Sequence, residues 1–109
     1  MLHTGDIVIV KFFYAEGKGY KYRPALVVSG TAFHKKFGLC WLVMITSAKN
    51  ESWADDIALP PSKSTGLNIA SVIRPAKIVT SQIDKTEKIG KAPEEVWKKA
   101  VKAAKRYLR

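Results

Sequence analysis

Residues that bind metals or form cross-links are scarce in this chain. Among its 109 residues there is one cysteine, Cys40, and there are two histidines, His3 and His34. A single cysteine cannot form an internal disulfide or supply a cysteine-rich zinc site. The two histidines stand far apart and suggest no metal site. We therefore expect neither a metal ion nor any other cofactor.

Acidic residues are also scarce, and long apolar runs are missing. Lysine and arginine number 19 against 9 acids, which gives a formal net charge of +10. Such an excess favours a polyanionic partner, either nucleic acid or an acidic protein segment. No apolar run approaches the roughly 18 residues of a membrane span, and no signal peptide precedes the first expected strand. We expect a cytoplasmic protein that does not enter a membrane.

The composition is that of one folded domain. Hydrophobic residues make up 47% and charged residues 26%, a balance typical of globular proteins. A chain of this length holds a single modest core, so residues 1–109 form one domain. Apolar runs bounded by turn residues predict strands, and 30–38 is an irregular connection or a short helix. The expected strands are Ile7 to about Tyr14, 22–29, 39–47, 55–59, 68–73 and 77–80, with the last two separated near Arg74.

The end of the chain has a helical pattern. Pro93 and two acids stand where a helix begins, and apolar residues recur at helical spacing from Val96 to Leu108. Lysines and arginines occupy the opposite face, which we expect to be solvated and to add a modest attraction for anions. The first strand and this helix carry more apolar surface than so short a chain can cover. That surplus predicts a homodimer.

The segment 22–29 places a cation at the mouth of a core strand. Pro24 biases Arg23 toward an extended conformation, and an apolar run typical of a buried strand follows. The preceding loop, 15–21, contains two glycines and two lysines. It resembles a loop that grips a substrate more than a tight structural turn. An arginine that merely borders a strand is the simpler interpretation of Arg23 alone.

The most apolar run, 39–47, ends in two hydroxyl residues, Thr46 and Ser47. Threonine is common in strands because it is β-branched, and serine is common where a turn begins. Side chains at the end of a strand can also reach a ligand. Both interpretations of this pair remain open from the residues alone.

Four segments, in this order, resemble the MazF/PemK family of toxin endoribonucleases. They are Gly5-Asp6-Ile7-Val8, the Arg-Pro segment 23–29, Ile45-Thr46-Ser47, and the region from Ser71 to Asp84 before the terminal helix. Each motif is short, but the ordered set covers nearly the whole chain. The resemblance implies a mainly β fold, an SH3-like β-barrel of the MazF/PemK/CcdB type with a C-terminal α-helix and short connecting helices. It also implies a homodimer and an acidic antitoxin that lies along an RNA-binding groove.

The resemblance assigns catalysis to two residues. The arginine of the Arg-Pro motif corresponds to Arg23, and the threonine of the Thr-Ser motif corresponds to Thr46. The implied reaction is metal-independent, sequence-specific cleavage of single-stranded RNA. The ribose 2′-hydroxyl attacks the adjacent phosphate and leaves a 2′,3′-cyclic phosphate. A guanidinium fork and a hydroxyl suit this reaction because the transition state gathers negative charge on the phosphate oxygens.

One expected part of such a site is missing. Some family members carry a histidine or an acid in the first loop, and an Asp-Gln pair after the arginine that matches Arg74. This chain has Gly17-Lys18 in that loop and Ala76-Lys77 after Arg74. The acid–base carboxylate is therefore absent from its usual position, and Glu16 is the nearest replacement in the sequence.

Several further residues are candidates for RNA contact. Cations can neutralise phosphates, while Tyr20 or Trp53 can stack on unpaired bases. Surface lysines are more often simply solvated, and core packing is an equal alternative for the two aromatics. The predicted RNA-binding residues are Lys18, Tyr20, Lys21, Ser47, Lys49, Arg74 and Lys77.

Three functions remain in competition at this point. The first is an RNA-cleaving toxin, favoured by the Arg23 and Thr46 motifs and by the basic charge. The second is a module of the same fold that binds RNA without cleavage, or a toxin that inhibits gyrase, and Ala76 favours this class. The third is a nucleic-acid-binding protein unrelated to toxins, which a shared fold alone does not exclude.

Overall fold

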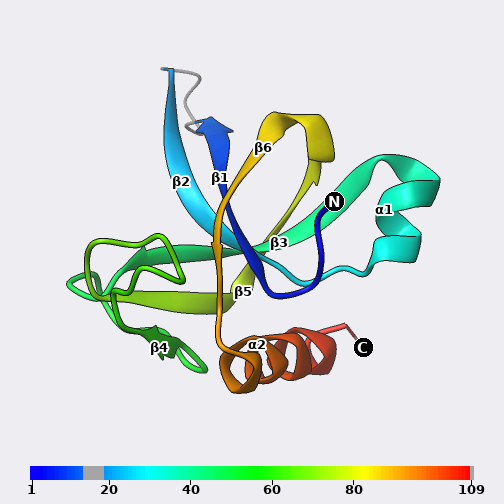
Figure 1. The fold of residues 1–109 in the computed structure, drawn as a ribbon. Coiled ribbons are helices and arrows are strands. Elements are labelled where there is room, and N and C mark those ends of the chain that lie inside the picture. The colour runs from blue at the N-terminus through cyan, green and yellow to red at the C-terminus, as the bar shows by residue number, and fades with distance from the viewer. Residues whose placement is uncertain (14–18, 109) are drawn as a thin grey trace.

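A computed structural model describes residues 1–13 and 19–108, and these build one curled sheet with two helices (Figure 1). The chain begins with two strands and a short helix, and it ends in a longer helix. The elements in order are β1 (Asp6–Phe13), β2 (Tyr20–Val27), α1 (Thr31–Phe37), β3 (Leu39–Ser47), β4 (Ile57–Leu59), β5 (Ser71–Gln82), a 3₁₀ turn (Ile83–Lys85), β6 (Thr86–Lys91) and α2 (Glu94–Arg106).

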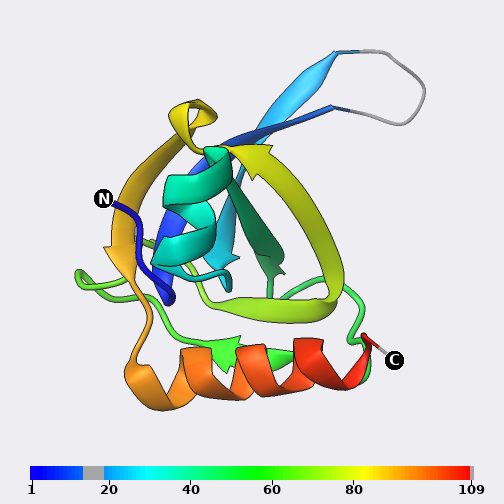
Figure 2. The ribbon, with the colours of Figure 1, turned by 90° about the vertical axis from the view of Figure 1, so that its right-hand side faces the viewer.

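The six strands form a single antiparallel sheet in the order β4-β5-β3-β2-β1-β6. The sheet curls into a half-barrel, and α2 lies along its outside next to β4 (Figure 2). The expected mainly β fold with a C-terminal helix is confirmed. No helix in the described part of the chain is long and apolar enough to cross a membrane.

The sheet is covered on both faces, which explains the nearly continuous apolar runs. Because side chains alternate along a strand, Val8, Leu42 and Met44 enter a cluster inside the curl. Their neighbours Ile7 and Val43 face the other way, into a second cluster that contains Ala100 of α2. The first strand therefore lies between the barrel interior and α2, and Ile7, Val8 and Val10 are buried within one protomer.

Gly5 sets the distance between the start of β1 and α2. Its φ is +96°, in the region that favours glycine, and a Cβ at this position would overlap the indole ring of Trp97. The backbone continues the contact, because the N–H of Gly5 donates to the carbonyl of Val27 at 2.8 Å and its carbonyl accepts from Ala92 at 2.9 Å. The Gly5-Asp6 motif thus fixes the packing of the helix on the sheet.

The second half of the sheet differs from the sequence prediction. Two strands separated near Arg74 were expected, but β5 runs unbroken from Ser71 to Gln82. Its pairing with β3 shifts between Val43 and Met44, whose partners are Ile78 and Arg74. Residues 75–77 form a bulge there, which accommodates Pro75 without ending the strand. The bulge also bends β5, so the sheet curls at this point.

A loop after β4 bridges the two edges of the sheet. The edge strands β4 and β6 do not pair with each other, but the N–H of Lys91 in β6 donates to the carbonyl of Ser64 at 2.8 Å. Gly66 has a φ of +75° and lies against the backbone of Ile89. The strand β6 was not predicted from the sequence, because Thr86–Lys91 is too polar to give a strand signal.

Candidate nucleic-acid interface

The strands β2 and β3 separate at Pro24. They pair over Ala25–Val27, with Ala25 opposite Met44. Pro24 has no N–H to donate, and the ladder with β3 ends at this residue, although β2 continues along β1 through Ile9↔Pro24. If the β2–β3 register is counted on by two residues, Arg23 and Thr46 hold corresponding positions just beyond the point where the strands separate. Residues opposite each other in an antiparallel pair share a face of the sheet.

Both of these side chains line one groove, which we call the Arg23–Thr46 groove. Its volume is about 420 Å³. Arg23 and Thr46 are each half-buried, so their polar ends remain accessible from the solvent. The loop that bridges the sheet edges supplies an apolar wall. The groove is also lined by Lys21, Tyr22, Pro24, Ile45, Ser47, Asn50, Leu67, Ile69 and Ser71.

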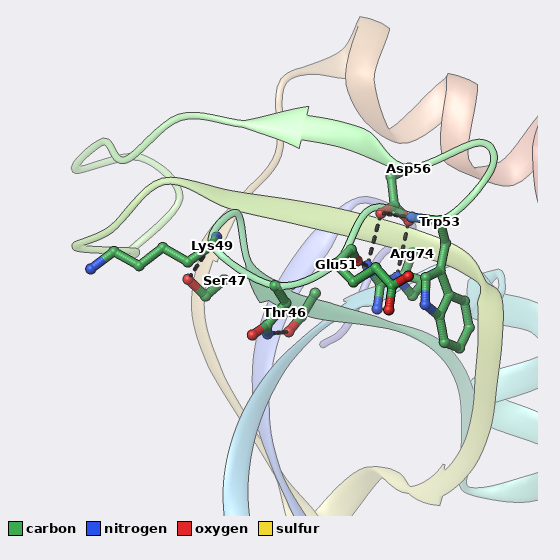
Figure 3. Close-up of polar contacts among 8 residues, drawn as sticks. Thr46, Ser47, Lys49, Glu51, Trp53, Asp56 and Arg74 are labelled. Atoms are coloured by element: carbon green, nitrogen blue, oxygen red, sulfur yellow. Dashed lines mark hydrogen bonds and ion pairs between the residues drawn. The ribbon is translucent and has the colours of Figure 1, made fainter.

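The hydroxyl of Thr46 is held by the turn that follows β3. The side-chain amide of Asn50 donates a hydrogen bond to Oγ1 of Thr46 at 2.5 Å (Figure 3). Ser47 holds the same turn, because its Oγ accepts from the N–H of Lys49 at 3.2 Å. Because the Thr46 oxygen accepts this hydrogen bond from Asn50, the hydroxyl can still donate its own proton to an acceptor in the groove. Asn50 was not a sequence-based candidate.

The predicted RNA-binding residues fall into distinct places. Lys21 and Ser47 line the groove with the catalytic candidates, and Lys49 is exposed on the adjacent turn. Lys77 lies exposed in the β5 bulge and is not among the residues that line the groove; its ammonium lies 5.6 Å from the ring centroid of Phe12. Tyr20 is 50% exposed at the start of β2, and the ammonium of Lys11 lies 4.2 Å from its ring centroid. Lys18 lies outside the described residues.

The sequence pattern of a family described as PemK-like, MazF-like toxins of type II toxin–antitoxin systems matches residues 3–108. The chain belongs to this family. The match spans the four segments in which the sequence resembled MazF/PemK proteins, so the family assignment is confirmed. No curated protein gives a significant match.

Solved structures of the MazF/PemK family share the fold. MazF from Deinococcus radiodurans has a TM-score of 0.79 at 21% identity, over 98% of this chain and 96% of that one. A MazE–MazF complex from the same organism gives 0.77 at 21% identity, over 98% and 95%. An endoribonuclease in complex with its cognate antitoxin, from a mycobacterial species, gives 0.70 at 18% identity, over 100% and 99%.

Arg74 departs from the other predicted RNA-binding residues. It is 8% exposed, and its guanidinium is committed to protein partners. Nε and Nη2 donate to the two carboxylate oxygens of Asp56 at 3.1 and 2.9 Å, and Nη2 also donates to the carbonyl of Glu51 at 2.7 Å (Figure 3). A bidentate pair of this kind leaves little of Arg74 for a phosphate. Arg74 is therefore not among the proposed RNA contacts.

The position after Arg74, where some MazF/PemK members carry an acid, is occupied by exposed Ala76 in the β5 bulge. Glu16, the replacement suggested by the sequence, lies outside the described residues. Within the described ranges, no three histidine, cysteine or acidic side chains gather as a metal site would require. The groove residues that the structure does bring together are a guanidinium, an ammonium, hydroxyls and an amide.

The ion pair between Arg74 and Asp56 makes the stability of the fold depend on pH. The hydrogen bonds from Arg74, together with the N–H of Trp53, hold the pKa of Asp56 below its ordinary value. A lowered pKa stabilises the fold above the ordinary carboxyl value of about 4, and this stabilisation is lost as the pH falls through the lowered value.

Replacing Asp56 by asparagine removes this ionisation. We expect Asp56→Asn to be less stable than the wild type at neutral pH, with the difference shrinking below about pH 4. Urea unfolding over a series of pH values measures this difference in stability. Asp84→Asn, at an exposed carboxylate, is the control. A difference that stays constant with pH would contradict the assigned role of the Asp56 charge.

Proposed function

We propose that this chain is the toxin of a type II toxin–antitoxin pair and that it cleaves single-stranded RNA in the cytoplasm. The observation that carries the proposal is that Arg23 and Thr46 line the same groove. Family membership supports it, and so does the formal net charge of +10.

In the proposed reaction, the 2′-hydroxyl of a ribose loses its proton and attacks the adjacent phosphorus. A bond from O2′ to phosphorus forms while the bond to the 5′ oxygen breaks, and that oxygen takes up a proton. The products are a 2′,3′-cyclic phosphate and a free 5′-hydroxyl. The reaction needs the 2′-hydroxyl, so DNA is not cleaved.

Arg23 and Thr46 act on the charge that develops in this reaction. The guanidinium donates to the phosphate oxygens, and the Thr46 hydroxyl, held by Asn50, donates one more hydrogen bond. Arginine keeps its proton at ordinary pH, so Arg23 stabilises the transition state and does not act as a base. Lys21, Ser47 and Lys49 lie at the groove or beside it and are the proposed contacts to flanking nucleotides.

The test of this function uses a long single-stranded RNA of mixed sequence in excess EDTA. Discrete fragments that end in a cyclic phosphate would support a metal-independent, sequence-specific endoribonuclease, and would give its recognition sequence. RNA that is bound but remains intact would favour a binding module instead. The same RNA with 2′-deoxyribose should stay intact in either case.

We further propose that an acidic antitoxin occupies the groove. The solved relatives include MazE–MazF complexes and an endoribonuclease bound to its cognate antitoxin. An acidic segment would meet the same cations that face RNA, among them Arg23 and Lys21. Binding would therefore block RNA by direct competition.

A second groove favours the homodimer that the sequence predicted. It lies between α2, the start of β3 and the second half of β5, and its volume is about 550 Å³. Its walls are mainly apolar, and Trp41, Ile78 and Leu108 are 44%, 40% and 68% exposed. Apolar side chains that gather on the surface mark an interaction site. We propose that a second copy of the chain covers this face.

A charge on this face should prevent association. We expect Ile78→Glu to convert a dimer into a monomer, because a carboxylate would be buried unpaired at the interface. Size-exclusion chromatography with light scattering measures the mass. Ile69→Glu, at an exposed isoleucine of the Arg23–Thr46 groove, is the matched control and should remain dimeric. A wild type that is monomeric at micromolar concentration would contradict the proposal.

A further inference from the structure

Trp53 is an exposed aromatic residue with one supported face. It lies in the loop between β3 and β4 and is 46% exposed. The guanidinium carbon of Arg74 lies 4.3 Å from the indole centroid, in cation–π contact (Figure 3). Because Arg74 itself is buried, the indole rests on a fixed group and not on a mobile surface side chain.

The backbone around Trp53 is held as well. Its N–H donates to Oδ2 of Asp56 at 3.0 Å, and its carbonyl accepts from the N–H of Asp56 at 3.3 Å. Arg74 binds Asp56 and the carbonyl of Glu51, so one guanidinium fastens both sides of the short segment that carries the indole. The segment is thus ordered before any ligand arrives, which lowers the entropic cost of binding.

Asp55, two residues after Trp53, attaches the segment 51–56 to α2. Asp55 accepts a hydrogen bond from the hydroxyl of Tyr107, and its carboxylate lies 3.6 Å from Nη2 of Arg106. The segment 51–56 is therefore fixed to β5 through Arg74 and to the C-terminal end of α2 through Asp55. Trp53 remains exposed between these two attachments.

The loop also connects Trp53 to the Arg23–Thr46 groove. Asn50 lines the groove, and Trp53 follows three residues later, so their Cα atoms are at most about 11 Å apart even in extended chain. A single strand that lies in the groove therefore brings its neighbouring nucleotides close to the indole. Unpaired bases stack on exposed aromatic rings, with little dependence on sequence.

We propose that Trp53 is a stacking platform for one unpaired nucleobase of the RNA that occupies the groove, with Arg74 and Asp56 as its positioning residues. This inference rests on the proposed function for the presence of RNA in the groove. The buried Arg74–Asp56 pair then contributes to substrate binding indirectly, because it holds Trp53 in place. Neither residue touches the RNA.

The binding test uses a mixed-sequence single-stranded RNA with 2′-O-methyl riboses, which cannot undergo the proposed cleavage. Fluorescence anisotropy gives its Kd. We expect Trp53→Ala to raise the Kd by about fivefold to a hundredfold, the range for loss of one stacked base. Trp53→Phe should stay close to the wild type. Phe37→Ala, which removes an exposed aromatic on α1, should leave the Kd unchanged.

The positioning residues are tested by Arg74→Lys. This variant keeps the charge but loses the planar fork, so it should weaken RNA binding and shift the Trp53 emission toward that of a solvated indole. The emission is read as the difference between proteins with Trp53 and with Phe at this position. On cleavable RNA, Trp53→Ala should raise KM and leave kcat unchanged, because the indole lies outside the reacting groups.

The outcomes separate this inference from the proposed function. An unchanged Kd in Trp53→Ala, beside a wild type that cleaves RNA, would overturn the stacking platform and leave the function standing. Weaker binding in Trp53→Ala, beside a wild type that binds but never cleaves, would support the platform and overturn the cleavage. A wild type that does not bind the RNA would overturn both.

Discussion

Replacing Arg23 by alanine is expected to lower the rate of RNA cleavage by at least about a hundredfold and to leave the fold unchanged. The guanidinium lines the same groove as Thr46. In the proposed reaction its donors bind the phosphate oxygens more strongly in the transition state, as further negative charge develops on them. No ion pair within the described residues ties Arg23 to the rest of the fold, so its loss removes no buried partner. Cleavage assays and circular dichroism measure the two effects.

Two further substitutions in β2 test whether the effect depends on the guanidinium of Arg23 or on positive charge alone. Arg23→Lys keeps the charge without the planar fork and should recover only part of the rate. Lys21→Ala removes another cation from the same groove, and we expect it to act mainly by raising KM. An Arg23→Ala protein with wild-type kcat, or one that fails to fold, would contradict the role assigned to Arg23.

Thr46 offers a conservative pair of variants. Thr46→Ala removes the hydroxyl that accepts from Asn50, whereas Thr46→Ser keeps it. If the hydroxyl donates to the phosphate, the serine variant retains most of the rate that the alanine variant loses. Equal losses in both would assign Thr46 to packing of the β3 end instead.

Replacing Gly66 by alanine is expected to destabilise the fold by about 3 kcal/mol or more. Its φ of +75° is unfavourable for alanine, and the new Cβ would overlap the carbonyl oxygen of Ile89. That oxygen belongs to the backbone of β6, and the loop is fastened beside it by the bond from Lys91 to Ser64. Neither side can move without opening the contact that bridges the sheet edges.

Gly30 provides the matched control for this substitution. It precedes α1 with a φ of −99°, and a Cβ there would meet nothing within 4 Å. Gly30 is the N-cap of α1, a position that favours glycine over alanine, and this cost opposes the gain from a less flexible unfolded chain. Gly30→Ala should therefore change the stability by less than about 1 kcal/mol in either direction, and because Gly30 also lines the second groove, the comparison is made on the monomer. Urea unfolding at one protein concentration compares the two variants, since the proposed dimerisation would make stability depend on concentration. Equal stabilities would mean that the loop moves freely away from β6.

The sequence predicted those strands whose side chains alternate between two apolar environments. The run 39–47 coincides with β3, and the helical pattern after Pro93 coincides with α2. Prediction from the sequence failed where strand pairing, and not the hydrophobic pattern, determines the local structure. The strand β6 is held by its ladder to β1, and the bulge of β5 is defined only by its register against β3. Neither partner is visible in the local sequence.

The same distinction applies to the candidate site. Arg23 and Thr46 stood out because each ends or borders a recognisable apolar run. The partner of Arg74, in contrast, lies 18 residues earlier in the chain, so the arginine looked like a surface cation. Asn50 was missed because its contact with Thr46 depends on how the turn after β3 folds back.

The register of β2 against β3 makes the candidate site and the core inseparable. A slip of one residue would turn Arg23 and Thr46 to opposite faces, and the same slip would move Leu26 out of the cluster that faces α2 and Ala25 and Val27 out of the barrel interior. The hydrophobic pattern that selects the register therefore selects the pairing of the two residues as well. A change in this register would therefore disrupt the core and the geometry of the candidate site together.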